Sequence, residues 1–284
     1  MIKSKNLRKM GGKVMAIVLL SLPLLSSCDS DDDYVPSREK KISVGDYALQ
    51  TKIEGKGSYT VVFISGLGES LSTWNKVQPE TADFATTISY DRGGIGKSDN
   101  APGIRSSEVI AIELDRLLIN SMVEAPYILV AHSIGGLHAR AYAHKFPDKV
   151  AGMVLVDVIH EAELLIGLGN LPEGLTPELV LEQIADEQNM ERGMRDEFIF
   201  SYLSAEQVAE ASFPDVPLHI ITAGLADAEE SPDSRELRLM LHKQLADKIP
   251  GAVHTIANNS RHHIQNDDPE LIIDSIKKII EKSI

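Results

Sequence analysis

The chain has 284 residues, with 28 Lys or Arg against 42 Asp or Glu, so its formal net charge is −14. A body this acidic repels phosphate backbones, and only 5% of its residues are aromatic, so the composition argues against sequence-independent nucleic-acid binding. A hydrophobic content of 43% argues against wholesale disorder. The 257 residues that follow the first 27 suit one large α/β domain or a domain with an insertion.

The first 27 residues predict a lipoprotein signal peptide. Residues 1–13 are basic, Val14–Leu25 is almost continuously apolar, and the only cysteine, Cys28, follows Leu-Ser-Ser. The apolar run is too short for a permanent membrane span, and Leu-Ser-Ser-Cys resembles the bacterial lipobox. We expect a lipid on Cys28 that anchors the protein to a membrane of the bacterial cell envelope, with the body facing the periplasm or the surface. A short anchor that is never cut is the alternative.

Residues 28–40 predict an acidic tether, because Asp29-Ser30-Asp31-Asp32-Asp33 is a self-repelling run. From residue 41 onwards, short apolar strands alternate with amphipathic helices, which predicts an α/β domain over 41–284 with a mostly parallel sheet covered on both faces. The expected strands cover 42–44 and 47–53 as a hairpin, then 60–65, 86–90, 127–131, 152–156, 218–222 and 253–257. The expected helices include 107–122, 135–146 and a final helix that begins at Asp268-Pro269.

The interval 160–216 contains no convincing strand. Helix starts are expected at Thr176-Pro177 and at a capping box, Ser204-x-x-Gln207. The interval is too long for a plain loop, so it predicts a helical cap inserted over the carboxyl edge of the sheet. Its apolar side chains either pack the cap on the body or line a pocket; they are Leu164, Leu165, Ile166, Leu179, Val180, Ile184, Phe198, Ile199 and Phe200.

Two glycine-containing segments follow predicted strands. Ala131-His132-Ser133-Ile134-Gly135-Gly136 opens a helix, as a nucleophile elbow does, with Ser133 as nucleophile and the Ile134 N–H facing an oxyanion. Ser65-Gly66-Leu67-Gly68 would supply a second oxyanion donor, the Leu67 N–H. An ordinary strand-to-helix turn is the alternative for each. Asp91–Ser98 (DRGGIGKS) lacks the spacing of a phosphate-binding loop and is interpreted as a structural turn.

His262, in the loop between the last strand and the last helix, can reach a serine at the carboxyl edge of the sheet and act as its base. The remaining histidines apart from His263 are expected to be surface or satisfied polar groups, with His160, which opens the cap, worth testing. Two carboxylates compete to orient His262. Asp157 ends the strand MVLVD, and Asp227 follows the next strand.

Together, D-R-x-G-x-G-x-S, A-H-S-x-G-G and S-x-H-x-I-Q-x-x-x-P-E-L resemble the α/β-hydrolase superfamily, most closely its serine esterase-like members, from about Tyr47 to Ile280. The resemblance implies Ser133 as nucleophile, His262 as base and the Leu67 and Ile134 amides as oxyanion hole, with no cofactor and no metal. The seven-residue spacing to Pro269 favours His262 over His263. Departures from the family pattern are Ala131, Ser65 and Arg261. Serine members of the family in which this strand ends V-L-V-D-x-x-H often lack an acid after the next strand. The resemblance therefore favours Asp157 as the acid, with Asp227 as the alternative.

The expected activity is hydrolysis of a carboxylic ester of a small or medium apolar acyl group through an acyl-enzyme. The partners would be a small ester-like molecule and a membrane, with no nucleic acid. Serine at position 133 speaks against haloalkane dehalogenase and epoxide hydrolase chemistry, which uses Asp in similar relatives. The same machinery could cleave an amide, a thioester or a carbon–carbon bond, and a non-catalytic ligand-binding lipoprotein is the alternative from another class.

Overall fold

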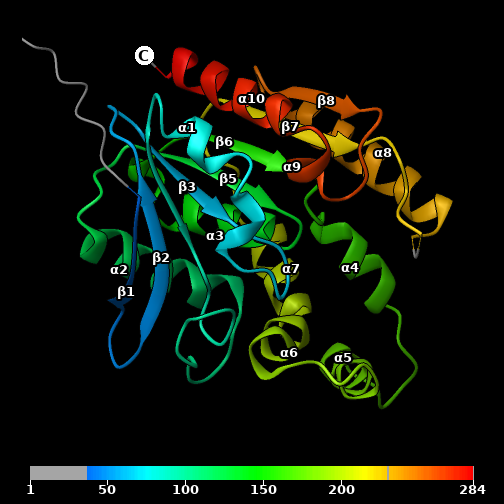
Figure 1. The fold of residues 1–284 in the computed structure, drawn as a ribbon. Helices are drawn as coiled ribbons and strands as arrows, with labels where there is room; N and C mark the ends of the chain where they lie inside the picture. The colour runs from blue at the N-terminus through cyan, green and yellow to red at the C-terminus, as the bar shows by residue number, and fades with distance from the viewer. Residues whose placement is uncertain (1–36, 229, 284) are drawn as a thin grey trace, which may run out of the picture. The chain divides into compact units, whose positions relative to one another are not determined.

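A computed structural model describes residues 37–228 and 230–283, which build one eight-stranded sheet in the order β1-β2-β4-β3-β5-β6-β7-β8 (Figure 1). β1, β2 and β4 pair antiparallel, and every pair from β4 through β8 is parallel. This confirms the predicted α/β fold with a mostly parallel sheet. The strands are β1 (Arg38–Ser43), β2 (Ala48–Glu54), β3 (Thr60–Ile64), β4 (Thr86–Tyr90), β5 (Tyr127–His132), β6 (Val150–Val156), β7 (Leu218–Ala223) and β8 (Val253–Ala257).

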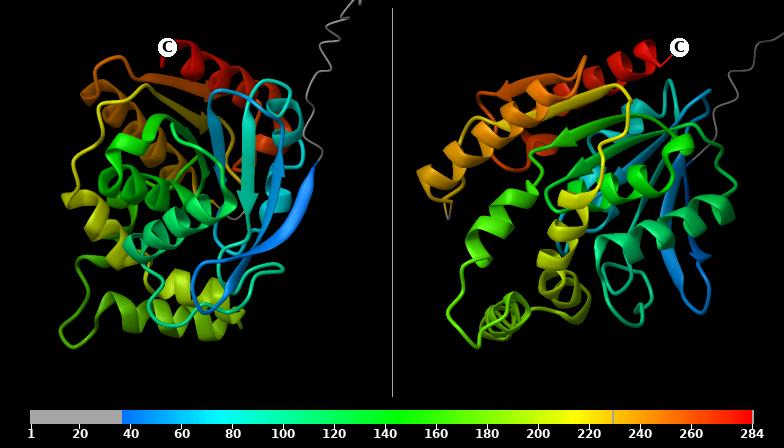
Figure 2. Two further views of the ribbon diagram at one scale, coloured as in Figure 1. Left: turned by 90° about the vertical axis from the view of Figure 1, so that its left-hand side faces the viewer. Right: turned by 180° about the vertical axis from the view of Figure 1, so that it is seen from behind.

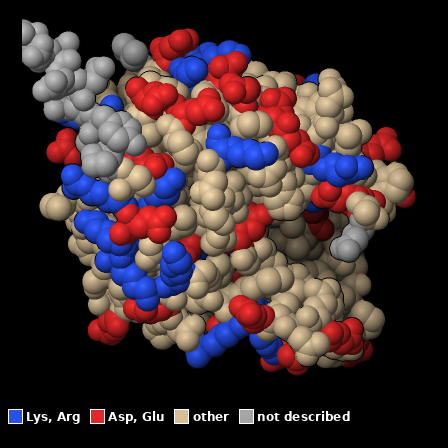
Figure 3. Space-filling view, viewed as in Figure 1, with Lys and Arg blue, Asp and Glu red and all other residues tan. Residues whose placement is uncertain are grey.

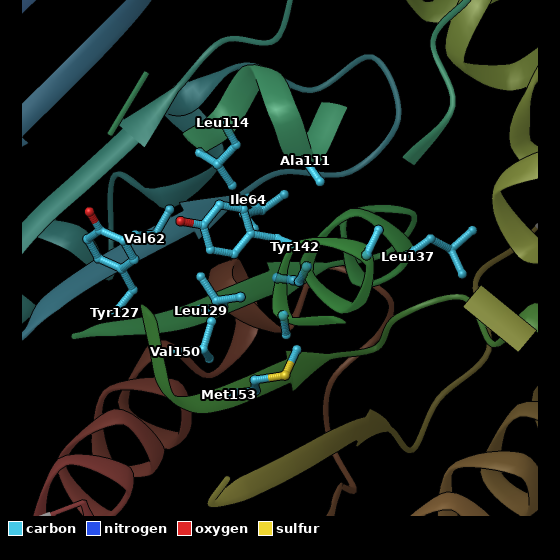
Figure 4. Packing of buried hydrophobic residues seen from close by; sticks show 14 of the residues in the cluster. Val62, Ile64, Ala111, Leu114, Tyr127, Leu129, Leu137, Tyr142, Val150 and Met153 are labelled. Carbon is cyan, nitrogen blue, oxygen red and sulfur yellow. The ribbon is translucent and has the colours of Figure 1, made fainter. Parts of the chain in front are cut away.

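Alternation along the central strands creates a core on each face of the sheet. In β3, Val62 and Ile64 face one helix layer, and Val61 and Phe63 face the other. The first layer contains α2 (Ser107–Ser121), α3 (Gly135–Lys145) and α8 (Pro232–Lys248). The second contains η1 (Leu71–Trp74), α1 (Gln78–Thr81) and α10 (Pro269–Lys282) (Figures 1 and 2). Figure 4 shows the first core, where Tyr142 of α3 packs between the sheet and α2.

The remaining body helices are η2 (Pro147–Lys149) and α9 (Ile264–Asp267). The predicted helices over 107–122 and 135–146 are confirmed to within one residue. The predicted start at Asp268-Pro269 is also confirmed, because the Asp268 carboxylate accepts from the Leu271 N–H at 3.3 Å.

The folded body begins earlier than the sequence indicates. β1 starts at Arg38, inside the segment 28–40 predicted as tether, and pairs with β2 from Arg38↔Ile53 to Ser43↔Ala48. All its residues except Ile42 are exposed, so this charged edge strand has no apolar run to reveal it. The predicted signal peptide 1–27, Cys28 and the acidic run lie outside the described residues. Within 37–228 and 230–283, no helix combines the length and hydropathy needed to cross a bilayer.

Residues 160–216 contain helices and no strand, as predicted, between β6 and β7. These helices are α4 (Glu161–Leu168), α5 (Pro177–Glu187), α6 (Arg192–Ile199) and α7 (Ser201–Glu210). Thr176 caps α5 by accepting from the Leu179 N–H, as expected. The capping box at Ser204 was wrong: Ser204 lies inside α7, where its hydroxyl donates back to the carbonyl of Phe200 at 3.0 Å.

Candidate active site

Ser133 occupies the turn between β5 and α3 in the strained conformation that a nucleophile elbow requires. Its φ is +54°, in the left-handed region that non-glycine residues rarely adopt. A Cβ on Gly135 would lie 2.7 Å from the carbonyl oxygen of Ile64, and one on Gly136 would lie 2.5 Å from Val158. The two glycines therefore allow the elbow to pack directly against the end of β3 and the segment after β6.

The carboxylate that meets His262 comes from Asp157, directly after β6. A 2.7 Å hydrogen bond joins Nδ1 of His262 to Oδ2 of Asp157, whose side chain is fully buried. Asp227 hydrogen-bonds Glu230 through its backbone, and in the part of the chain that the structure describes its carboxylate bonds no histidine. The structure thus brings Asp157 to the predicted base and leaves the alternative acid, Asp227, apart from it.

Two arginines of α8 also bind the Asp157 carboxylate. Nη1 of Arg235 lies 2.7 Å from Oδ1, Nη1 of Arg238 lies 3.3 Å from Oδ2, and the Ala223 N–H donates to Oδ1 at 2.9 Å. Burial alone would raise the pKa of Asp157, but hydrogen bonds from His262 and Arg235 and the charge of Arg238 hold it far below its usual range. Asp157 is therefore ionised at neutral pH. Sequence reasoning did not find these arginines, which lie about 80 residues away on a helix with a mostly polar pattern.

His262 lies beside the elbow. Its ring centroid is 4.5 Å from that of His132, the residue before Ser133, and Nε2 of His132 donates to the His262 carbonyl at 3.0 Å. Burial lowers the pKa of His262 below its usual value, although its bond to Asp157 opposes this effect. The neutral ring is the form that accepts a proton. Among the described residues, the Ser133 hydroxyl bonds no partner, and catalytic hydrogen bonds of this type often tighten only when substrate binds.

The predicted oxyanion donors, the N–H groups of Leu67 and Ile134, donate to no other group in the described part of the chain. Arg92 fixes the first of them, because its Nη1 and Nη2 donate to the carbonyls of Ser65 and Gly66, each at 2.7 Å. In a trans peptide the C=O and N–H point in opposite directions. The Gly66 carbonyl held by Arg92 therefore directs the Leu67 N–H away from Arg92.

The segment Asp91–Ser98 is a structural turn, as its glycine spacing predicted. The Asp91 carboxylate accepts from the N–H of Leu71 at 2.6 Å and from that of Lys97 at 2.7 Å. A Cβ on Gly96 would lie 2.2 Å from Oδ2 of Asp91, and the φ of Gly96 is +56°. Gly96 is therefore needed so that the turn can close around the Asp91 carboxylate, and not to bind a phosphate.

The cap touches the predicted oxyanion turn through α6. Glu197 forms a buried bidentate pair with Arg92, with Nε–Oε1 and Nη2–Oε2 distances of 2.8 Å. Met194 lies against Gly68, where an added Cβ would be 2.8 Å from its sulfur. Figure 3 shows a hollow in this face, between α4 and α7 and below α9, which follows the His262 loop. The cap thus borders a recess below α9.

Three of the other histidines, His160, His242 and His254, have structural partners. His160 caps α4 in a capping box with Glu163. His242 and His254 both bond the Thr222 hydroxyl, at 2.7 and 2.8 Å, and burial lowers the pKa of His242 to about 3. These contacts agree with their interpretation as satisfied polar groups.

A further titratable cluster adjoins the elbow. Oε2 of Glu69 lies 3.0 Å from Nδ1 of His132, and Oε1 lies 2.8 Å from Nε2 of His263. Burial alone would raise the pKa of Glu69, but the hydrogen bond and charge of His132 and the Gly66 N–H lower it to about 2. Among the described residues these three side chains are the group that could hold a metal ion. Glu69 was not singled out from the sequence, because its histidine partners come from distant segments.

Comparisons with known proteins agree with this architecture. A model of the "alpha/beta hydrolase fold" family matches residues 59–270. The uncharacterised protein YqjL of Bacillus subtilis is 26% identical over 235 residues, covering 82% of this chain and 88% of its own.

Two solved structures are similar in fold. A thermophilic esterase from Thermogutta terrifontis has a TM-score of 0.58 at 20% identity, covering 87% of this chain and 99% of its own. An epoxide hydrolase mutant from Vigna radiata has a TM-score of 0.65 at 16% identity, with the same coverage. Such low identities show the fold alone. With the family model matching most of the chain, the protein belongs to the alpha/beta hydrolase fold family and is a hydrolase of that fold.

Proposed function

We propose that this protein is a serine hydrolase that cleaves a carboxylic ester through an acyl-enzyme on Ser133. The observation that carries the proposal is the 2.7 Å hydrogen bond between His262 and Asp157, next to an elbow whose serine has a φ of +54°. An ionised, buried carboxylate would fix the ring orientation and stabilise the imidazolium that forms during the reaction.

The chemistry follows from this arrangement. The Ser133 hydroxyl attacks the ester carbonyl as Nε2 of His262 takes its proton, and the Leu67 and Ile134 amides stabilise the negative oxygen. Collapse of the tetrahedral intermediate breaks the bond to the alkoxy oxygen, which receives the proton from His262. Water then attacks the acyl-enzyme with His262 again as base, releasing the carboxylic acid and restoring Ser133.

The cap favours an apolar acyl group of small or medium size. Met194, Phe198 and Phe200 are only half-buried, and α4 has no fully buried side chain, although its Leu164 packs against the first core. If these residues served mainly to pack the cap on the body, more of them would be buried. Their partial exposure on the cap supports the interpretation that they line a pocket. Cleavage of an amide, a thioester or a carbon–carbon bond uses the same groups and is the alternative within this class.

The reaction of the Vigna radiata neighbour is not transferred to this chain. Position 133 is serine, whose hydroxyl forms an ester with an acyl group, whereas the resemblance associates epoxide opening with an aspartate nucleophile. The esterase from Thermogutta terrifontis accords with the proposal but does not decide it at 20% identity.

We also propose that residues 1–27 are a signal peptide and that Cys28 carries a lipid, which places the protein in the bacterial cell envelope. The support is the order of the sequence: a basic start, an apolar run and Leu-Ser-Ser-Cys.

A serine-directed fluorophosphonate tests the catalytic proposal. The protein is expected to be labelled, and Ser133→Ala is expected to remain folded and unlabelled. A panel of p-nitrophenyl esters of increasing acyl length, run beside peptide amides, then tests the substrate class. A folded protein with intact Ser133 that resists labelling would favour the non-catalytic, ligand-binding alternative.

A further inference from the structure

We propose that Glu69, His132 and His263 form a binding site for a divalent transition-metal ion of the zinc type. The ion would bind beside the predicted catalytic groups without taking part in ester cleavage. The claim goes beyond the proposed hydrolase activity and does not depend on it.

The donor set fits such an ion. The candidate ligand atoms of the three side chains lie within 4.8 Å of one another. Two imidazoles and a carboxylate form a common zinc donor set, with zinc–ligand distances of about 2.0–2.2 Å, and tetrahedral geometry then separates the donors by about 3.3 Å. The observed separations of Glu69 oxygens from His132 and His263 nitrogens are 3.0 and 2.8 Å. Small side-chain shifts would therefore open the cluster around an ion.

The hydrogen bonds of His132 provide a second, independent indication. Its ring is fully buried, and both nitrogens face acceptors: Nδ1 faces the Glu69 carboxylate and Nε2 faces the His262 carbonyl. Both acceptors are satisfied only when each ring nitrogen carries a proton or when a cation takes the place of the proton on Nδ1. A metal ion on Nδ1 would take that place beside Glu69, and the N–H on Nε2 would still donate to the carbonyl. This is the usual outer partner of a metal-bound histidine.

The surroundings orient the carboxylate and leave an entry route. The Gly66 N–H donates to Oε2 of Glu69 at 2.7 Å, which fixes the carboxylate in place. The His263 side chain is 49% exposed and that of Glu69 is 19% exposed, so an ion can arrive from solvent on that side. Hard cations such as Mg²⁺ prefer all-oxygen ligands, so they match this site poorly.

An ion here would connect three segments of the predicted active site. Glu69 lies two residues after Leu67, His132 precedes Ser133, and His263 follows His262. Binding would therefore hold the oxyanion turn, the elbow and the histidine loop together.

The test is titration calorimetry of the purified protein, made without a polyhistidine tag, with Zn²⁺ and with Mg²⁺. One Zn²⁺ per chain is expected, with a rise in melting temperature, while Mg²⁺ is expected to give no binding. Co²⁺ in place of Zn²⁺ should give the visible absorption of a four-coordinate site. Ser133→Ala is expected to bind Zn²⁺ like the parent protein, which separates this site from the hydrolase proposal.

Glu69→Gln and His263→Asn each replace a ligand and are expected to weaken Zn²⁺ binding by at least about 10-fold. Removing only an outer hydrogen-bond partner of a ligand already costs about 10- to 100-fold in affinity. His263 is the safer variant for folding because its side chain is half-exposed. His144→Asn, at an exposed histidine outside the cluster, is the matched control and is expected to bind normally. Absence of a one-to-one Zn²⁺ site, or equal affinity in His263→Asn and His144→Asn, would overturn the proposal.

Discussion

Replacing Arg92 by lysine tests how the predicted oxyanion turn is held. Arg92 is almost fully buried and donates to the carbonyls of Ser65 and Gly66 and to both oxygens of Glu197. A lysine ammonium has the same charge but cannot reproduce this planar set of contacts. Without Arg92 the Gly66 carbonyl keeps only its hydrogen bond from the Glu69 N–H, at 3.2 Å, so the Leu67 N–H is held less firmly.

Complete loss of one oxyanion donor costs about 10²–10³ in kcat, or roughly 2.7–4 kcal/mol. Because lysine can retain part of the contact, we expect kcat/KM for a p-nitrophenyl ester to fall by about 10²-fold in Arg92→Lys. The rate of fluorophosphonate labelling of Ser133 should fall in parallel. Stability should fall by roughly 1–3 kcal/mol in urea unfolding, because buried charge-assisted hydrogen bonds are lost.

Arg105→Lys provides a matched control. Arg105 is equally buried and pairs with Glu113 at 2.8 and 3.0 Å, but it donates to no atom of the oxyanion turn. It should lose comparable stability while retaining its labelling rate. The reasoning is refuted if folded Arg92→Lys keeps kcat/KM within about threefold of the parent, or if Arg105→Lys is slowed as much.

Further predictions address the acid, the buried histidines and the N-terminus. Asp157→Asn should lower kcat by about 10⁴-fold through the wrong imidazole tautomer, whereas Asp227→Asn should leave steady-state kinetics near parent values; the reverse pattern would contradict the assignment. The pKa of His242 is lowered to about 3, so its folded form stays neutral while the unfolded form takes up a proton near pH 6.5. Its contribution to stability is therefore complete above pH 6.5 and falls by about 1.4 kcal/mol per pH unit between 6.5 and 3. Urea unfolding across that range should show a shallower pH dependence in His242→Gln, and an unchanged dependence would refute the inference. Cys28→Ser should abolish metabolic labelling with a fatty acid and release the protein from the membrane fraction; continued membrane attachment would instead indicate an uncleaved anchor.

Local patterns predicted the central sheet because most of its strands are buried on both faces and rich in apolar residues. The elbow was also predictable, since Gly135 and Gly136 must be small where α3 meets β3 and the segment after β6. β1 was placed too late, because an exposed edge strand needs no apolar residues. The capping box at Ser204 failed because a serine followed by glutamine three residues later also fits the interior of a helix, where the hydroxyl bonds the preceding turn.

The site was less accessible to sequence reasoning than the fold. Arg92 donates to backbone carbonyls 27 and 26 residues away, and its pairing with Glu197 spans 105 residues. Arg235 and Arg238 reach Asp157 across 78 and 81 residues. Such contacts depend on which distant segments meet at the carboxyl edge of the sheet. Local hydrophobic periodicity indicates helices and strands but does not indicate which of them come together.

The ion pairs between cap and body constrain how this scaffold can be re-engineered. Arg92 pairs with Glu197 of α6, and Arg238 bridges Asp157 to Glu163 of α4, with Nη2–Oε2 at 2.8 Å. Grafting a foreign segment in place of 160–216 would remove Glu197 from Arg92 and Glu163 from Arg238. A chimaera with a foreign cap, made to change substrate specificity, would therefore need glutamates at the positions of Glu163 and Glu197. The cap is for this reason a poor choice for replacement as an independent module.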